Sequence, residues 1–290
     1  MSAALAPAPL PTSRRLADRP LTFLRKRAAS IRRTCREIRS KGRAHPSKVH
    51  TLRRACRACE SALLLLAPAE QPETGLLRRR LRRLRRAAGA VRDADVALSL
   101  TRDPCAPFPP KELSAFRSGL RALRRQRERE LLDYLDRRPK GGLARGLRET
   151  KRLAAQGSRL LMDSVRQLQS EVLAQAAAAP SDAEALHNLR LAAKRLVYAC
   201  RVLKIVWPTV ESTRGLVSVL GEAQDWDALT RLALDLEPQA PRPGRRRGTL
   251  ASRFQSIAAQ RLQLAEHAVA RFLAAAQSGS PRRPVQQRGS

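Results

Sequence analysis

The chain has 290 residues, and its 58 lysines and arginines against 25 aspartates and glutamates give a formal net charge of +33. Repulsion among so many like charges opposes compaction, so the composition favours a polyanion as partner. Aromatic residues make up only 3% of the chain, which disfavours single-stranded nucleic acid binders that stack bases on aromatic rings. Alanine, leucine and arginine dominate, and these helix formers predict an all-α fold that buries a substantial core.

The N-terminal residues and the cysteines indicate the compartment. Residues 1–15 are rich in proline and alanine and are predicted to form a disordered tail without the features of a signal peptide. The five cysteines show no disulfide-framework spacing, which favours a reducing compartment. No apolar run approaches the ~18 residues that span a bilayer. We therefore expect a cytoplasmic protein that does not associate with membranes.

Residues 16–138 are predicted to form a first half of four helices. Apolar residues recur at heptad spacing from Leu21 to about Lys41, beside Arg25 and Arg32. A second helix opens at Pro46 and ends at Leu66. Helices follow at about 72–101, which holds the densest arginine run of the chain, and at about 111–136.

Residues 143–277 are predicted to form a second half of four helices after the break at Arg138–Gly142. The first helix, at about 143–179, carries Arg145, Arg148 and Arg152 along one face. A helix capped by Ser181 or Asp182 runs to Trp207. The last two helices are expected at 211–236 and 249–277, before a disordered tail at 278–290.

Two of these helices carry a stripe of one histidine and two cations. On a helix, His50, Arg53 and Arg57 lie on one face at i, i+3 and i+7, and His187, Arg190 and Lys194 repeat this spacing. Cations on a solvated helix face usually alternate with acids at i±3 or i±4, and these stripes are nearly free of them. The stripes therefore indicate a site for a multiply charged anion. Arginines one turn away should favour the neutral imidazole of His50 and His187 in the free protein, and a bound polyanion should reverse this and draw protons onto these histidines.

A second motif pair supports an internal duplication. The run Gly89-x3-Asp93-x-Asp95 matches Gly221-x3-Asp225-x-Asp227, at an offset of 132 residues against 137 for the two histidines. The sequence thus predicts two antiparallel four-helix bundles related by a pseudo-two-fold axis.

Metal and catalytic sites are alternative interpretations of the same motifs. Aspartates two residues apart on a helix point about 200° apart, so one pair cannot chelate one ion, and pairing with arginines of neighbouring helices is the better interpretation. Cys56 and Cys59 are interpreted as small buried side chains rather than zinc ligands. No catalytic constellation or nucleotide-binding loop is recognisable, so we expect no enzyme, no metal and no cofactor.

The duplicated His-x-Leu-Arg-x3-Arg/Lys helix, followed each time by the Gly-x3-Asp-x-Asp helix, resembles the CHAD domain (conserved histidine α-helical domain). The resemblance covers about residues 16–277. It implies a pair of four-helix bundles around a basic groove or pore that binds inorganic polyphosphate, with targeting to polyphosphate granules. Carried over by position, it points to His50, Arg53 and Arg57, and to His187, Arg190, Lys194 and Arg195.

The leading hypothesis is a non-enzymatic module that binds inorganic polyphosphate at granules, where client proteins are possible partners. Arginine, whose planar fork of donors suits phosphate, outnumbers lysine in the chain. Sequence-nonspecific nucleic acid binding is the alternative, and an enzyme acting on phosphate polymers is a third hypothesis. Further candidate contacts are Arg25, Arg32, Arg54, Arg79, Arg82, Arg83, Arg86, Arg145, Arg148, Arg152 and Arg201.

Overall fold

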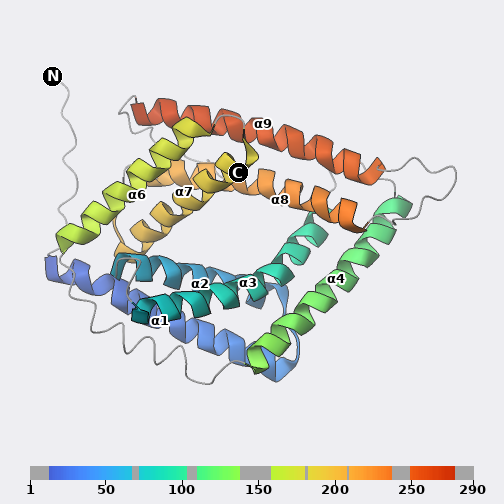
Figure 1. Cartoon of the computed structure of the whole chain (residues 1–290), viewed down its shortest axis with the longest axis horizontal. Helices are drawn as coiled ribbons and strands as arrows, with labels where there is room; N and C mark the ends of the chain where they lie inside the picture. The colour runs from blue at the N-terminus through green and yellow to red at the C-terminus, as the bar shows by residue number, and fades with distance from the viewer. Residues whose placement is uncertain are drawn as a thin grey trace, which may run out of the picture.

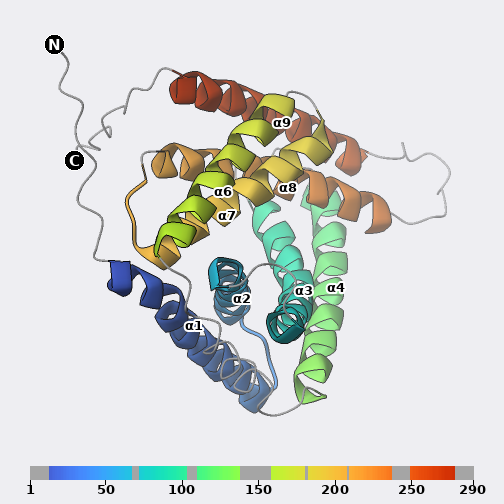
Figure 2. The ribbon, with the colours of Figure 1, turned by 60° about the vertical axis from the view of Figure 1, so that its left-hand side comes forward.

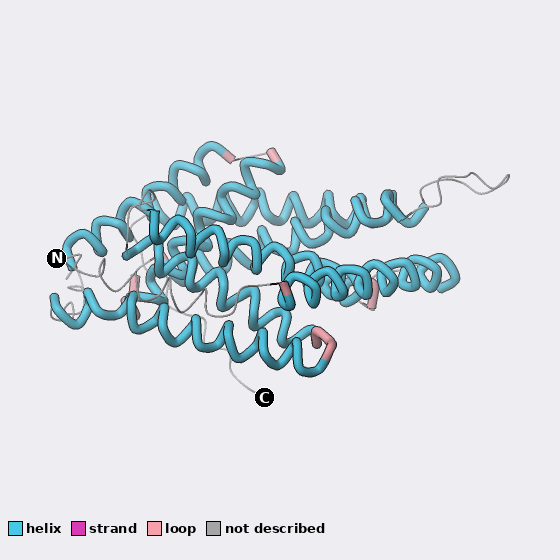
Figure 3. Tube along the Cα trace, turned by 60° about the horizontal axis from the view of Figure 1, so that its bottom comes forward, coloured by secondary structure: helices cyan, strands magenta, loops and turns pink. Residues whose placement is uncertain are grey.

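Helices account for nearly all of the residues that the structure describes. A computed structural model describes residues 13–66, 72–102, 110–137, 158–179, 182–207, 209–236 and 249–277, and within these ranges it contains helices and no strand (Figure 3). The predicted all-α class is therefore confirmed. The helices are α1 (Ser13–Lys41), α2 (Pro46–Leu66), α3 (Pro72–Leu100), α4 (Pro110–Asp136), α6 (Ser158–Ala178), α7 (Ala183–Leu203), α8 (Val210–Leu236) and α9 (Thr249–Gln277).

Among the described residues, the helices pack as two sets of four, α1–α4 and α6–α9 (Figure 1). In each set every helix contacts the next one along the chain, and the first contacts the fourth: α1 with α4, and α6 with α9. Figure 2 shows α1–α4 as the lower set and α6–α9 as the upper one. Contacts of α1 with α6 and α7, of α2 with α7 and of α3 with α8 join the two sets. The predicted division into halves at residues 16–138 and 143–277 stays a prediction, and its boundary at 138–142 lies outside the described residues.

The two sets share one apolar core. Ile31, Leu52 and Leu84 of the first set and Leu196 and Leu216 of the second belong to the same cluster of buried side chains. A smaller cluster joins the C-terminal parts of α3 and α8 to the N-terminal parts of α4 and α9. There the Phe254 ring lies 5.5 Å from that of Phe116 and 6.2 Å from that of Trp226, between centroids. Because the main core crosses between the sets, α2 and α7 are held against each other.

Helix ends differ from the predicted boundaries in two places. The first helix begins at Ser13, within the segment predicted as a tail, and contains Pro20. Helix α7 begins after Asp182, whose carboxylate accepts hydrogen bonds from the backbone N–H groups of Glu184 and Ala185, as predicted for an N-cap. It ends at Leu203, before the predicted Trp207, because Lys204 adopts a left-handed conformation with φ of 50°.

The buried cysteines match their interpretation as core side chains. Cys56 and Cys59 are 0% and 1% exposed. Burial raises the pKa of the Cys59 thiol to about 12, so the reactive thiolate is disfavoured. In the described part of the chain, no helix is both long enough and apolar enough to cross a bilayer.

Candidate anion-binding site

The contact between α2 and α7 brings the two predicted stripes together. Arg53 and Arg190 both act electrostatically on Arg57, and Arg53, Arg57 and Arg190 all act on Lys194. We call these four residues, two from each half of the chain, the central cluster. The sequence predicted each stripe separately, and the fold places them within electrostatic range of one another.

Both Arg53 and Arg190 lie against a glycine on the neighbouring helix. A Cβ atom at Gly89 of α3 would lie 3.9 Å from Arg53 Nε, and one at Gly221 of α8 would lie 2.9 Å from Arg190 Nη2. Arg190 Nη1 donates a hydrogen bond to Gln224 Oε1 at 2.5 Å. The missing side chain at position 221 therefore gives the Arg190 guanidinium its room. These parallel contacts agree with the interpretation as a duplication, which stays a prediction.

Each half also supplies an aspartate one helical turn beyond its glycine. Arg53 Nη1 lies 3.1 Å from Asp93 Oδ1. Burial raises the pKa of Asp225, while Arg190, Lys194 and Arg53 act in the opposite direction. Against the four basic groups of the central cluster, these two acids leave an excess of positive charge.

The four aspartates of the two motifs were predicted to pair with arginines of neighbouring helices. The ion pairs of three of them, Asp93, Asp95 and Asp227, test this prediction. It is confirmed for Asp93, as described, and for Asp95, whose Oδ1 lies 3.0 Å from Arg124 Nε of α4. It is wrong for Asp227, which pairs with Arg231 on its own helix at 2.7 Å. Asp227 and Arg231 are one turn apart, so the local pair forms without help from another helix.

The cluster is partly buried, and burial is the largest influence on the pKa values of Lys194, Arg57 and Arg190. It lowers the pKa of Lys194 to about 6, with further lowering by Arg190, Arg57 and Arg53. It lowers the pKa of Arg57 to about 10, and it also lowers that of Arg190. Arg190 Nε is buried without a hydrogen-bond partner among the described residues. Burying an unsatisfied donor and a poorly solvated cation costs free energy that a bound acceptor would recover.

The two histidines lie at the exposed edge of the site. His50 and His187 are both exposed and lie one turn before Arg53 and Arg190. The pKa of His50 is lowered, as predicted, but partial burial contributes more than any single arginine does, and Arg92 of α3 contributes more than Arg54 or Arg53. These histidines are therefore placed to meet a ligand entering the cluster from solvent.

Other predicted contacts lie away from the cluster or at its margin. Arg195 pairs with Glu171 of α6, with Nη1 and Oε1 2.5 Å apart, so it faces a different helix. Arg201 continues the α7 stripe and lies over the Tyr198 ring, 5.6 Å from its centroid. Exposed candidates without a described contact to the cluster are Arg25, Arg32, Arg54, Arg79, Arg82, Arg83 and Arg86. Arg145, Arg148 and Arg152 lie outside the described residues.

Several residues that shape the site were not identified from the sequence. Gln224, which accepts a hydrogen bond from Arg190, lies three residues after Gly221, within the second motif. The motif placed Gln224 on a helix, but nothing in the sequence indicated its contact with Arg190. Within the arginine run of α3, Arg85 Nε binds Glu60 Oε2 at 2.9 Å, and Arg78 Nη2 donates to the Leu63 carbonyl at 2.9 Å. These two arginines tie α3 to α2. The exposed arginines of the run remain accessible to a ligand.

Comparison with known proteins agrees with this fold. A family model described as the CHAD domain matches residues 22–234. The solved CHAD domain from the plant Ricinus communis is 20% identical with a TM-score of 0.62, covering 99% of this chain and 93% of that one. The solved PptA from Streptomyces chartreusis is 15% identical with a TM-score of 0.62, covering 90% of this chain and 99% of that one. No curated protein matches the chain.

Proposed function

The chain belongs to the CHAD domain family, and from this premise we propose that it binds inorganic polyphosphate at the central cluster between α2 and α7. The family is known for its association with polyphosphate, which supports the choice of ligand. The observation that carries the proposal is the meeting of Arg53 and Arg57 with Arg190 and Lys194, one pair from each half of the chain.

The chemistry of the cluster suits a phosphate chain. Polyphosphate offers about one negative charge per phosphate and several acceptor oxygens. Arginine binds such oxygens through a planar fork of donors, and hydrogen bonds to charged groups are stronger than neutral ones. Acceptor oxygens from a ligand would satisfy Arg190 Nε and restore the proton to Lys194. The ligand would thus offset the free energy that burial of the cluster costs.

We propose a binding module rather than an enzyme. Catalysis of phosphate transfer would require carboxylates that converge on a metal ion. Asp93 forms an ion pair with Arg53, and the charges of Arg190 and Lys194 lower the pKa of Asp225 against the effect of burial. Both acids therefore serve to position the basic residues.

Association with polyphosphate granules, where the protein could meet client proteins, is part of the same proposal.

Competition for one labelled ligand tests this function. Fluorescent long-chain polyphosphate bound to the full chain would be displaced by unlabelled polyphosphate, ribosomal RNA or duplex DNA, at equal phosphate concentration and physiological salt. We expect unlabelled polyphosphate to displace the label at a concentration at least about tenfold lower than either nucleic acid. The scarcity of aromatic residues removes stacking contacts with the unpaired bases of RNA, and a stiff DNA duplex follows a defined site less closely than a flexible phosphate chain does. Equal displacement by RNA or DNA would favour nonspecific nucleic acid binding instead. Magnesium-dependent release of phosphate would contradict the binding-module proposal.

A further inference from the structure

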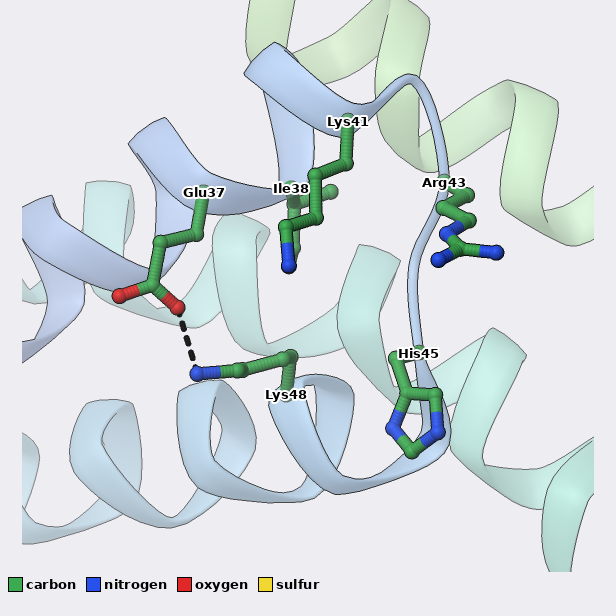
Figure 4. Close-up of a pocket in the computed structure, with 6 residues that line it drawn as sticks. All are labelled: Glu37, Ile38, Lys41, Arg43, His45 and Lys48. Atoms are coloured by element: carbon green, nitrogen blue, oxygen red, sulfur yellow. Dashed lines mark ion pairs between the residues drawn. The ribbon is translucent and has the colours of Figure 1, made fainter.

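A second group of basic side chains surrounds a pocket at the turn between α1 and α2. The pocket has a volume of about 240 Å³ and is lined by Glu37, Ile38, Lys41, Arg43, His45 and Lys48. Figure 4 shows these residues around the space between the end of α1, the turn and the start of α2. Four of the six are basic or can become cationic. None of them belongs to the central cluster.

The turn that carries Arg43 and His45 is fixed from behind by α4. Arg124 Nη2 donates to the Ala44 carbonyl at 2.5 Å, and the Ala44 N–H donates to Glu128 Oε1 at 2.5 Å. Arg124 is itself held by Asp95 and Glu128. Gly42 supplies the left-handed conformation of the turn, with φ of 56°. The pocket therefore has a preformed wall, which reduces the conformational entropy lost when a ligand binds.

The charge of the pocket is only partly balanced. Lys48 Nζ lies 2.6 Å from Glu37 Oε2, and this contact is the main reason why the pKa of Glu37 is lowered. In the part of the chain that the structure describes, Lys41 acts on Glu37 through its charge without forming an ion pair, and Arg43 has no ion pair with an acid. His45 is oriented by Ser47, whose Oγ lies 2.8 Å from Nδ1. An anion would thus meet two unpaired cations and an oriented imidazole.

The pocket lies on the opposite side of α2 from the stripe. At 100° per residue, Arg53 and Arg57 lie about 140° and 180° around the helix from Lys48. The contacts agree, because Lys48 pairs with Glu37 of α1 whereas Arg53 pairs with Asp93 of α3. A short ligand therefore cannot occupy both places at once.

We propose that this pocket is a second oxyanion site, which holds one phosphoryl group through Lys41, Arg43 and His45 while Glu37 keeps Lys48 in position. The phosphoryl group could come from a distant part of a chain bound at the central cluster or from a small phosphorylated molecule. The site goes beyond the proposed function, since it needs only the α1–α2 turn and its support by α4.

Because the chain has only four histidines, and they lie in different places, their signals can show separately whether each site is occupied. We suggest titrating the full chain with inorganic triphosphate and following the imidazole signals by NMR. His45 reports the pocket, His50 and His187 report the central cluster, and the exposed His267 on α9 serves as reference. We expect the His45 signal to shift and saturate while that of His267 stays nearly constant.

Two matched variants test the assignment. Lys41→Gln/Arg43→Gln should weaken the His45 response at least about tenfold and leave those of His50 and His187 unchanged, since it removes two charge-assisted contacts. Lys26→Gln/Arg36→Gln, which removes the same charges from exposed positions of α1, should leave all signals as in the unchanged protein. A His45 signal that follows His267, or that weakens equally in both variants, would overturn the second site. A responsive His45 with unresponsive His50 and His187 would support the pocket and count against the central cluster.

The source of the phosphoryl group is distinguished with Arg190→Gln/Lys194→Gln. If the pocket serves a chain anchored in the central cluster, this variant should weaken the His45 response to long-chain polyphosphate but not to triphosphate. If the pocket serves small phosphorylated molecules, both responses should persist. Either result supports the pocket, and disappearance of the triphosphate response in this variant would contradict its independence.

Discussion

At the scale of single residues, the protonation of Lys194 is affected by all three arginines of the central cluster. Burial and three arginines lower its pKa from 10.5 to about 6, so the folded, ligand-free protein holds a largely neutral amine above pH 7. The unfolded chain keeps that proton up to the ordinary lysine pKa. It therefore binds more protons than the folded state between about pH 6 and 10. This residue's contribution lowers the stability of the free protein as pH falls through that range.

Binding of polyphosphate should reverse this effect and draw a proton onto Lys194. A nearby polyanion favours the ammonium form, so we expect proton uptake at pH 8, where a histidine with a pKa near or below ~6.5 would remain neutral. Calorimetry in buffers of different ionisation enthalpy measures this uptake. Lys194→Arg keeps the positive charge but does not titrate in this range, so it should abolish the uptake at pH 8. Undiminished uptake in that variant would place the proton elsewhere.

At the scale of helices, the glycines of α3 and α8 set the distance between the helix backbones and the cluster arginines. Gly221→Ala would place a Cβ atom 2.9 Å from Arg190 Nη2 and force the guanidinium to move. Because the clash involves the end of a flexible side chain, and alanine favours helix over glycine by about 1 kcal/mol, we expect unchanged or higher thermal stability together with weaker polyphosphate binding.

Gly215→Ala is the matched control for this change on the same helix. A Cβ atom there would meet nothing within 4 Å, so this variant should gain stability and keep its affinity. Thermal unfolding and a binding titration on both variants provide the comparison. Equal affinities would show that the position of the Arg190 guanidinium is unimportant for binding.

Helical spacing indicates which arginines of the α3 run lie on the same face as the contacts to Arg53. Arg82 and Arg86 lie seven and three residues before Gly89, so they share a face with Gly89 and Asp93, which contact Arg53. A phosphate chain that extends from the cluster along α3 would meet them first. Each phosphate that a basic residue neutralises contributes about 0.7 to the slope of log affinity against log salt for a single strand, so Arg82→Gln/Arg86→Gln should reduce that slope by roughly 1–2.

The control for this change is Arg121→Gln/Arg125→Gln, which removes two exposed arginines from α4 at the same spacing. Binding titrations between low and physiological salt give the slope for each variant. A slope that changes as much in the control would mean that α3 makes no particular contact with the ligand. In that case the run contributes only to the net charge of the protein.

Helices and their charged stripes were predictable from the sequence because both follow from spacing along the chain. The stripes at His50 and His187 and the N-cap at Asp182 needed only local information. The meeting of Arg57 with Lys194 was not predictable, since it depends on how α2 crosses α7. For the same reason, proton linkage was expected at histidines, whereas burial makes Lys194 the more strongly shifted group.

At the scale of the whole molecule, the question is whether polyphosphate recognises a site or only a net charge of +33. A core shared by both halves holds α2 against α7, so the central cluster is a product of the complete fold. A diffuse basic surface would attract the same ligand without any defined geometry. Screening separates these cases, because at physiological salt long-range attraction fades beyond ~8 Å.

The most direct measurement compares the affinity of two charge-reversal variants for polyphosphate at physiological salt. Arg190→Glu/Lys194→Glu alters the central cluster, and Arg121→Glu/Arg125→Glu replaces two basic side chains by glutamate at the same spacing on exposed positions of α4. Contacts to charged groups contribute about 1.5–3 kcal/mol each. The cluster variant should therefore bind at least about a hundredfold more weakly with little change in helix content, while the α4 variant should keep most of its affinity. Equally weakened binding in the two variants would contradict a defined site and leave only the net charge.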